Sequence, residues 1–261
     1  MSIKDSKEFI KELKSNPKRF YIIHYSCQNF YDDSQRLSPR ITSIAIQHHS
    51  SGQALSFSMH VVAEELGVSR DDVIDNFDKI ERKLLEDFYE FIRNRRDKYW
   101  VHWNMRNQTY GFEHIQHRYR ILTKEDAPIV PVESRVNLND MVVSKYGDQY
   151  ADHPKMINLM MMNEGRHRHF MTGEEEVSAF EKKEFIRMHN STLCKVGFFS
   201  TVISRMITGQ LRTSSWGIGI FVDRALESRA AKIAALILTF CSLLQLGYQL
   251  IPLLLTFGID I

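Results

Sequence analysis

The sequence predicts a mixed α/β domain, a sheet flanked by helices, followed by a long apolar helix near the C-terminus. Short runs of β-branched and aromatic residues occur in the first half of the chain. Amphipathic helical patterns lie between these runs and dominate the second half. Near the C-terminus, no Asp, Glu, Lys or Arg occurs from Ile233 to Ile259. The first two observations predict the α/β domain, and the third predicts the apolar helix.

Composition excludes two broad classes. With 43% hydrophobic and 25% charged residues, the chain has the make-up of a folded globular protein and is not wholly disordered. The net charge of +2 gives no global electrostatic case for a nucleic-acid coat protein. The local basic run Arg93–Arg96 is typical of a solvated helix end.

The cysteines indicate a reducing compartment. The chain has 3 of them, Cys27, Cys194 and Cys241, which are far apart and form no CxxC pair. This pattern fits neither a disulfide framework nor a zinc site. The first residues are charged and lack the apolar core of a signal peptide, so the main domain is expected in the cytoplasm. No cofactor is expected.

The periodicity of apolar residues gives the order of the elements. A capping box, Thr172 with Glu175, marks the start of one late helix. The predicted strands are Phe20–Ser26, Arg40–Gln47, Ala54–His60 and Tyr99–His102. The predicted helices are Asp5–Lys14, Val61–Leu66, Asp71–Arg95, Tyr110–Leu122, Val136–Tyr146, Pro154–Met162, Gly173–Val196 and Phe198–Gly209.

This order divides the chain into four segments. They are an N-terminal helix in residues 1–18, an α/β domain in 19–196, a helical connector with a basic flank in 197–232, and the apolar helix in 233–259. Three strands come first, and a fourth then alternates with helices, which is a mixed α/β pattern.

Several signposts in the α/β domain resemble a known family. The first predicted strand leads to Gln28, and the second begins with Arg40-Ile41. Further along, Trp100–Asn104 contains a His-x-Asn sequence, and a predicted helix begins within Tyr110–Ile115. In this order and spacing, residues 19–196 resemble the DEDD-type 3′–5′ exonucleases. That resemblance implies a ribonuclease H-like fold, with a mixed sheet flanked by helices.

The catalytic acids of that family are replaced in this chain. Such enzymes use four carboxylates to hold two divalent metal ions about 4 Å apart. Carried over by position, the first Asp-x-Glu pair falls on Ser26 and Gln28, and the later Phe-Asp pair falls on Tyr110 and Gly111. Hydroxyl, amide and glycine groups do not hold two hard cations. The resemblance therefore implies a degenerate enzyme, with no resident metal and no assignable catalytic residue.

The last motif of the family, a His followed five residues later by an Asp, falls on His169 and Glu174. These two residues leave open an active nuclease with His and Glu metal ligands. The other reading of Glu174 is a carboxylate in a first helical turn, where the helix dipole favours it. Among other histidine pairs, His114 with His117 and His167 with His169 lack any zinc-site context, and His114 with His117 is equally typical of a solvated helix face.

Polar residues follow the first and fourth predicted strands. Ligands bind at the carboxyl ends of adjacent strands in open α/β sheets. We therefore expect a nucleotide or nucleic-acid end to bind there, with Arg106 contacting phosphate. The alternative is that the same side chains only tie the loops to the backbone. The candidate ligand-binding residues are His24, Ser26, Gln28, His102, Asn104 and Arg106.

The charge-free segment 233–259 is long enough to span a bilayer, for which about 20 apolar residues suffice. The basic residues on its N-terminal side predict a cytoplasmic domain anchored by its C-terminal tail. Polar side chains fall on one stripe of this helix, which predicts self-association into a homo-oligomer. The stripe consists of Ser242, Gln245, Gln249 and Thr256. The soluble alternative is a buried helical hairpin broken near Gly247 or Pro252.

Taken together, these expectations describe a membrane-anchored, catalytically degenerate exonuclease-like domain. By analogy of architecture alone, this layout suits a sensor or effector of bacterial antiviral defence. An active metal-dependent nuclease and a scaffold that self-associates through its C-terminal helix are the alternatives.

Overall fold

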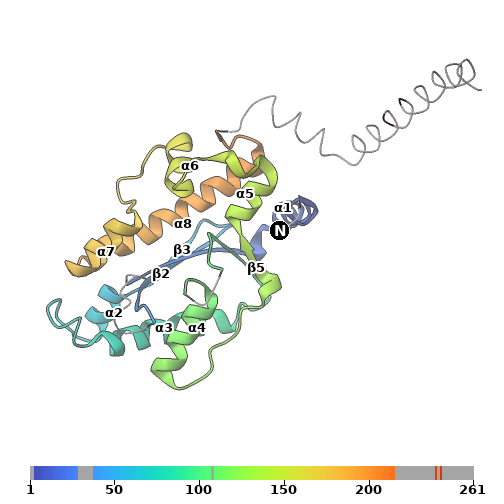
Figure 1. Cartoon of the computed structure of the whole chain (residues 1–261). Helices are drawn as coiled ribbons and strands as arrows, with labels where there is room; N and C mark the ends of the chain where they lie inside the picture. Colours follow the sequence, from blue (N-terminus) through green and yellow to red (C-terminus); the bar gives the residue numbers. More distant parts are fainter. Residues whose placement is uncertain (1–2, 29–37, 107–108, 215–238, 240–241, 243–261) are drawn as a thin grey trace, which may run out of the picture. The chain divides into compact units, whose positions relative to one another are not determined.

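The structure is a computed structural model, and it describes residues 3–28, 38–106, 109–214, 239 and 242. By its contacts the chain divides into one unit of residues 1–214 and a second of residues 215–261. The first unit contains the whole sheet and the helices that pack on it (Figure 1). It confirms the predicted mixed α/β fold.

The sheet has five strands in the order β3-β2-β1-β4-β5. Three strands are antiparallel neighbours, because β2 pairs antiparallel with both β1 and β3. On the other side of β1, strands β4 and β5 follow in parallel. The carboxyl ends of β1, β3, β4 and β5 therefore lie at the same edge. The strand bounds are β1 Phe20–Cys27, β2 Ile41–His48, β3 Ala54–Ser58, β4 Tyr99–His102 and β5 Arg135–Asn137.

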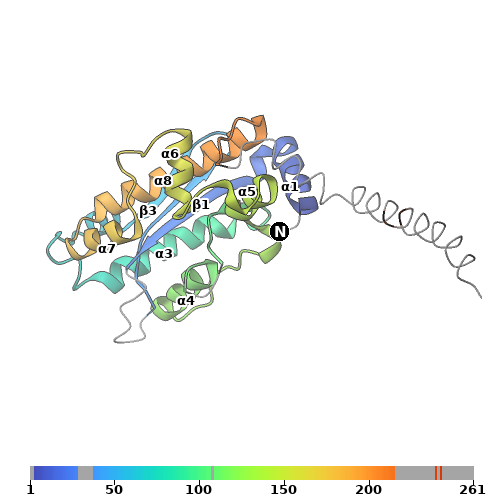
Figure 2. The ribbon, with the colours of Figure 1, turned by 45° about the horizontal axis from the view of Figure 1, so that its top comes forward.

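Helices cover both faces of the sheet (Figures 1 and 2). Alternation along β1 separates two cores, because successive side chains of a strand point to opposite faces. Ile23 and Tyr25 pack with α2, α3 and α4, whereas Phe20 and Ile22 pack with α1, α5, α6 and α8. The helix bounds are α1 Ile3–Ser15, α2 Met59–Glu65, α3 Phe77–Arg93, α4 Phe112–Thr123, α5 Leu138–Tyr146, α6 Lys155–Asn163, α7 Gly173–Glu181 and α8 Phe185–Thr208. Short 3-10 turns η1 Pro17–Arg19, η2 Val132–Ser134 and η3 Asp148–Tyr150 complete the described elements.

Two predicted boundaries in the first half were wrong. The third strand ends at Ser58, and His60 already belongs to α2. The long helix predicted from Asp71 begins only at Phe77. The Ser69 hydroxyl accepts a hydrogen bond from the Asp72 N–H at 3.4 Å and donates to its carboxylate at 2.6 Å, which holds a turn there.

Two boundaries in the second half also differ. The helix predicted from Val136 is preceded by β5, and its N-cap is Asn137, whose Oδ1 accepts the Asn139 N–H at 3.1 Å. The late helices break between α7 and α8, not near Gly197, which lies inside α8. The break contains Lys183, whose φ of 55° is left-handed and cannot continue a helix.

The predicted membrane helix lies almost wholly outside the described residues. Within that segment the structure describes only Thr239 and Ser242, both with helical backbone. Gln245, Gln249 and Thr256 are not among them. In the described part of the chain, no helix is both long and apolar enough to cross a membrane.

Candidate functional site

A buried polar layer lies between the sheet and α8. The helix lies across β1, β2 and β3, where a closely packed apolar contact would be usual (Figure 1). Instead, Ser26 is opposite Ser43, and Ser43 is opposite Ser58, so that three serines form one row across three strands. All three are at most 2% exposed. We call these three residues the serine row.

One carboxylate sits at the β1 end of the serine row. Glu176 of α7 accepts the Lys195 ammonium at 2.6 Å and the Ser191 hydroxyl at 2.8 Å, both on Oε1. The Ser26 hydroxyl lies 3.4 Å from the same oxygen and 2.6 Å from the Thr192 hydroxyl. Ser26, Glu176, Ser191, Thr192 and Lys195 form what we call the strand-end cluster.

The cluster is internally neutral. The side chains of Lys195 and Glu176 are only 7% and 14% exposed, so each is the other's main compensation for lost hydration. Phe170 covers the pair, with the Lys195 ammonium 5.5 Å from the centre of its ring. Removing either charge would leave the other buried without a partner.

His24 lies two residues before Ser26 on the same face of β1, and it is 5% exposed. Its ring nitrogen Nδ1 is 3.2 Å from the Tyr110 hydroxyl, and Phe199 of α8 packs edge-on against the ring at 5.5 Å. Burial lowers the pKa of His24 well below its usual value, and the neighbouring Lys195 and His102 lower it further. At neutral pH this imidazole is uncharged.

A separate polar network follows β4 and β5. Arg106 donates to the carboxylate of Asp140 and, at 3.0 Å, to Oδ1 of Asn104. That oxygen also accepts from the side chain of Asn137 at 3.1 Å, and the Asn104 N–H donates back to Asn137 at 3.1 Å. Asn104 has a left-handed φ of 53°, which an asparagine tolerates better than most residues. His102 Nδ1 accepts the Met105 N–H at 3.2 Å.

The six residues predicted as one site therefore do not form one cluster. His24 and Ser26 face α8, as just described, while Asn104 and Arg106 belong to the network after β4. His102 orders the loop that directly follows β4, through its hydrogen bond from the Met105 N–H. Gln28 lies beyond a bulge after Ser26, and its described contact is a backbone hydrogen bond from its N–H to the Arg40 carbonyl at 2.8 Å.

The rings of His167 and His169 lie 5.5 Å apart, but the other histidine and acid candidates form no metal site among the described residues. His169 accepts a hydrogen bond from its neighbour Arg168 at 2.9 Å, and Glu174 is exposed in the first turn of α7. The interpretation of His114 as a solvated residue was wrong, because it is 1% exposed and bridges the Tyr25 hydroxyl and the Pro39 carbonyl, each at 2.9 Å. Within the described ranges, no three His, Cys, Asp or Glu side chains are grouped so as to hold a metal ion.

Sequence reasoning missed the charged half of the strand-end cluster. Met188, Thr192, Lys195 and Phe199 follow one another at helical spacing, and all are buried. A lysine within such an apolar stripe is the signal that was available. Glu176 gave no comparable signal, because it is one of three successive acids at the start of α7.

A basic loop adjoins the cluster. Arg166, His167, Arg168 and His169, which we call the basic loop, line a cavity of about 330 Å³ together with Arg187 of α8. Arg166 donates to both carboxylate oxygens of Glu175 at 2.7 Å. Arg168, by contrast, has no carboxylate within ion-pair distance among the described residues. The loop joins the cluster through the next residues, because the Met171 N–H donates to Ser191 at 3.2 Å.

Comparison with known proteins gives no relative for this arrangement. No protein-family model matches the chain, and no curated protein or solved structure matches it either.

Proposed function

We propose that this chain is a ribonuclease H-like domain that has lost two-metal catalysis and binds a nucleotide or a nucleic-acid end. We further propose that residues 233–259 anchor it to a membrane with the domain on the cytoplasmic side. The sheet supports the first part of the proposal, because its three consecutive antiparallel strands, followed by parallel β4 and β5, agree with the resemblance in the sequence.

The observation that carries the proposal is the ion pair of Lys195 with Glu176. A two-metal site needs several anionic oxygens that converge on empty space. Here the strand-end cluster offers one carboxylate, and an ammonium group already binds it at 2.6 Å. Its other members, Ser26, Ser191 and Thr192, are neutral hydroxyls. A divalent cation would have to displace a buried lysine and would gain a single charged ligand.

The basic loop supports ligand binding. Arg168 is exposed, lines this cavity and has no acidic partner in the described part of the chain, whereas Arg187 in the same cavity is paired with Glu184. Guanidinium groups bind phosphate through paired, charge-assisted hydrogen bonds. The loop is attached to the strand-end cluster at Met171, so a phosphate there would lie beside the degenerate centre. Arg106, the phosphate ligand expected from the sequence, is instead occupied by Asp140.

The first test is catalytic. The purified full-length protein, with Mg²⁺ or Mn²⁺, should leave single-stranded DNA and RNA intact in a gel assay. Degradation that disappears in His169→Ala or Glu174→Ala would instead establish the active nuclease. Degradation that survives both changes would point to a contaminating enzyme, which a second purification would remove.

The second test is binding. Fluorescence anisotropy with end-labelled single-stranded RNA and DNA should detect a complex that weakens as salt rises. Arg168→Ala should raise the Kd about tenfold, since one charge-assisted hydrogen bond is worth about 1.5–3 kcal/mol. The matched control is Arg120→Ala, an exposed arginine on α4. Equal Kd values for the two variants would contradict the basic loop as the contact.

A further inference from the structure

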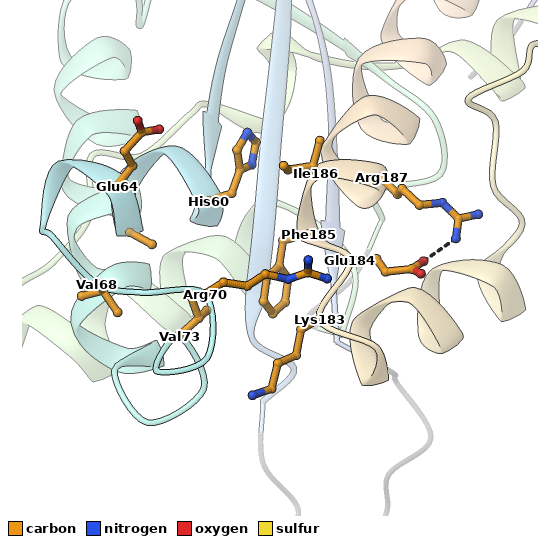
Figure 3. Close-up of a pocket in the computed structure, with 11 residues that line it drawn as sticks. His60, Glu64, Val68, Arg70, Val73, Lys183, Glu184, Phe185, Ile186 and Arg187 are labelled. Atoms are coloured by element: carbon orange, nitrogen blue, oxygen red, sulfur yellow. Dashed lines mark hydrogen bonds and ion pairs between the residues drawn. The ribbon is translucent and has the colours of Figure 1, made fainter.

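A second cavity lies at the first turn of α8, and Arg187 lines both this cavity and that of the basic loop. It has a volume of about 530 Å³ and is lined by α2, by the segment between α2 and α3, and by the first turn of α8 (Figure 3). Ligand sites in proteins have volumes of about 300–1,000 Å³, so this cavity has the size of a site for a small molecule.

The floor and walls of this cavity are apolar. Ala63, Val73 and Phe185 line it, and each is at most 5% exposed. Val68 and Ile186 complete the apolar lining. Ile186, in the first turn of α8, is 59% exposed. A ligand with an apolar body would cover this side chain.

Basic side chains also line this cavity. Arg70 is exposed and has no carboxylate partner among the described residues, and Figure 3 shows its side chain reaching toward the start of α8. Lys183 comes from the break between α7 and α8, and its ammonium donates to the Asp71 carbonyl at 3.0 Å. Arg187 is already paired with Glu184, as the dashed line in Figure 3 marks. Neither Arg70 nor Lys183 has a carboxylate within ion-pair distance in the described structure, although Glu64 also lines the cavity.

One residue that lines the cavity also has a buried polar atom with no described hydrogen bond. Nδ1 of His60 is buried and makes no hydrogen bond within the described structure. Such an atom is usually satisfied by water or by a ligand. Burial also lowers the pKa of His60, so the ring is neutral and has one donor and one acceptor.

We propose that this cavity binds a small amphipathic anion, a molecule with an apolar body and one carboxylate or phosphate group. Arg70 and Lys183 would bind the anionic group, Phe185 and Ile186 would cover the apolar body, and His60 would accept or donate one hydrogen bond. Because α2 and α8 both contribute, binding would connect two elements that otherwise share few contacts. This proposal does not rest on nucleic-acid binding at the basic loop, although Arg187 lines both cavities.

The experiment uses 8-anilinonaphthalene-1-sulfonate, an apolar anion that fluoresces when it leaves water, with the full-length protein in detergent; the probe's fluorescence in the same detergent without protein is subtracted at every concentration. Arg70→Glu should raise the probe's Kd about tenfold or more, the loss expected for a charge-assisted contact turned repulsive. Val68→Trp should abolish the signal by filling the cavity. The matched control is Arg120→Glu, which makes the same charge change on α4 and should leave the Kd within about twofold of wild type.

Displacement identifies the chemistry of the natural ligand. Decanoate and AMP are titrated separately against the bound probe. Displacement by decanoate indicates an acyl carboxylate, and displacement by AMP indicates a nucleoside phosphate. The proposal fails if decanol displaces the probe as well as decanoate does, because no anion is then recognised. It also fails if neither anion competes, or if Arg70→Glu and Arg120→Glu bind the probe equally.

Discussion

Four histidines are buried in the first unit, and each is held by a neutral neighbour. His189 shows the pattern most clearly, because its two ring nitrogens lie 2.8 Å from the Ser43 hydroxyl and 3.3 Å from the Ser56 hydroxyl. The other three buried histidines are His24, His102 and His114. None of them has a carboxylate within ion-pair distance in the described structure, so nothing there favours the charged imidazolium.

The buried histidines should make stability depend on pH. Burial lowers the pKa of His102 to about 3 and that of His114 and His189 to about 4, whereas an unfolded histidine titrates near 6.5. Below pH 6.5 these histidines therefore bind protons in the unfolded chain but remain neutral in the folded chain. As the pH falls to about 4, the free energy of unfolding decreases. Each of these three histidines should lower the free energy of unfolding by up to about 2 kcal/mol between pH 7 and pH 5. Urea unfolding at several pH values would measure this slope.

A single substitution separates this effect from general acid sensitivity. His189→Gln keeps hydrogen-bonding groups near Ser43 and Ser56 but does not titrate, so the slope between pH 7 and pH 5 should become shallower. The comparison is His117→Gln on α4, where the side chain is exposed and unfolding changes its surroundings little. Identical slopes in the two variants would show that His189 is not among the groups responsible.

At the scale of elements, a buried ion pair joins α3 to α4. Glu81 is 0% exposed, and its Oε1 accepts the Arg118 Nε–H at 2.9 Å and the Ile41 N–H at 2.8 Å. The Arg118 side chain is 7% exposed. One carboxylate thus connects both helices to the first residue of β2. Removal of either member of this ion pair would leave the other as an unpaired buried charge, which destabilises the fold.

Arg118→Met should therefore destabilise the fold by about 3–5 kcal/mol, measured by chemical denaturation. Adding Glu81→Gln should recover part of this loss, since the amide oxygen can still accept the Ile41 N–H. Arg82→Met provides the control, because the Arg82–Glu86 pair lies on the exposed face of the same helix and should matter little. An Arg118→Met variant as stable as the control would mean that the pair is solvated in solution.

Elements with a strong local pattern were predictable, and those set by distant contacts were not. The β1 run of aromatic and β-branched residues and the capping box of α7 are local signals, and both are confirmed. Strand β5 has three residues, and only pairing with β4 makes it a strand. The same distinction applies to the site. His24 and Ser26 followed from their place on β1, whereas Glu176 and Lys195 reach Ser26 only through the packing of α7 and α8.

At the scale of the whole molecule, the last residues of the first unit are firmly attached to it. Leu211 is 1% exposed, and the Ser214 N–H donates to the Tyr150 carbonyl at 2.9 Å. Asn163 holds the chain between them, with hydrogen bonds to the N–H and carbonyl of Arg212 at 3.0 and 2.9 Å. A chain ending at Ser214 keeps these contacts, and one ending before Leu211 loses them.

A chain ending at Ser214 should thus be soluble and folded, whereas the full-length chain should fractionate with membranes and resist carbonate extraction.

Replacing Gln245 and Gln249 with Leu should reduce oligomer size in detergent without releasing the protein from membranes, since each amide contact between helices is worth roughly 0.5–2 kcal/mol in a membrane. Light scattering after extraction would measure the size. Purification of the full-length chain from cytosol without detergent, with aggregation of the shorter chain, would show that the apolar segment belongs to a soluble core.

The pairing of Lys195 with Glu176 also constrains how this fold can evolve. Suppose that mutation placed an acid at position 26 alone. The new carboxylate would lie next to Glu176 with one ammonium to share, so one of the two acids would take up a proton rather than recruit a cation. If Lys195 were lost first, Glu176 would become an unpaired buried charge and the folded state would be less stable. Each single step is unfavourable, so a metal site at this cluster would require several coordinated changes.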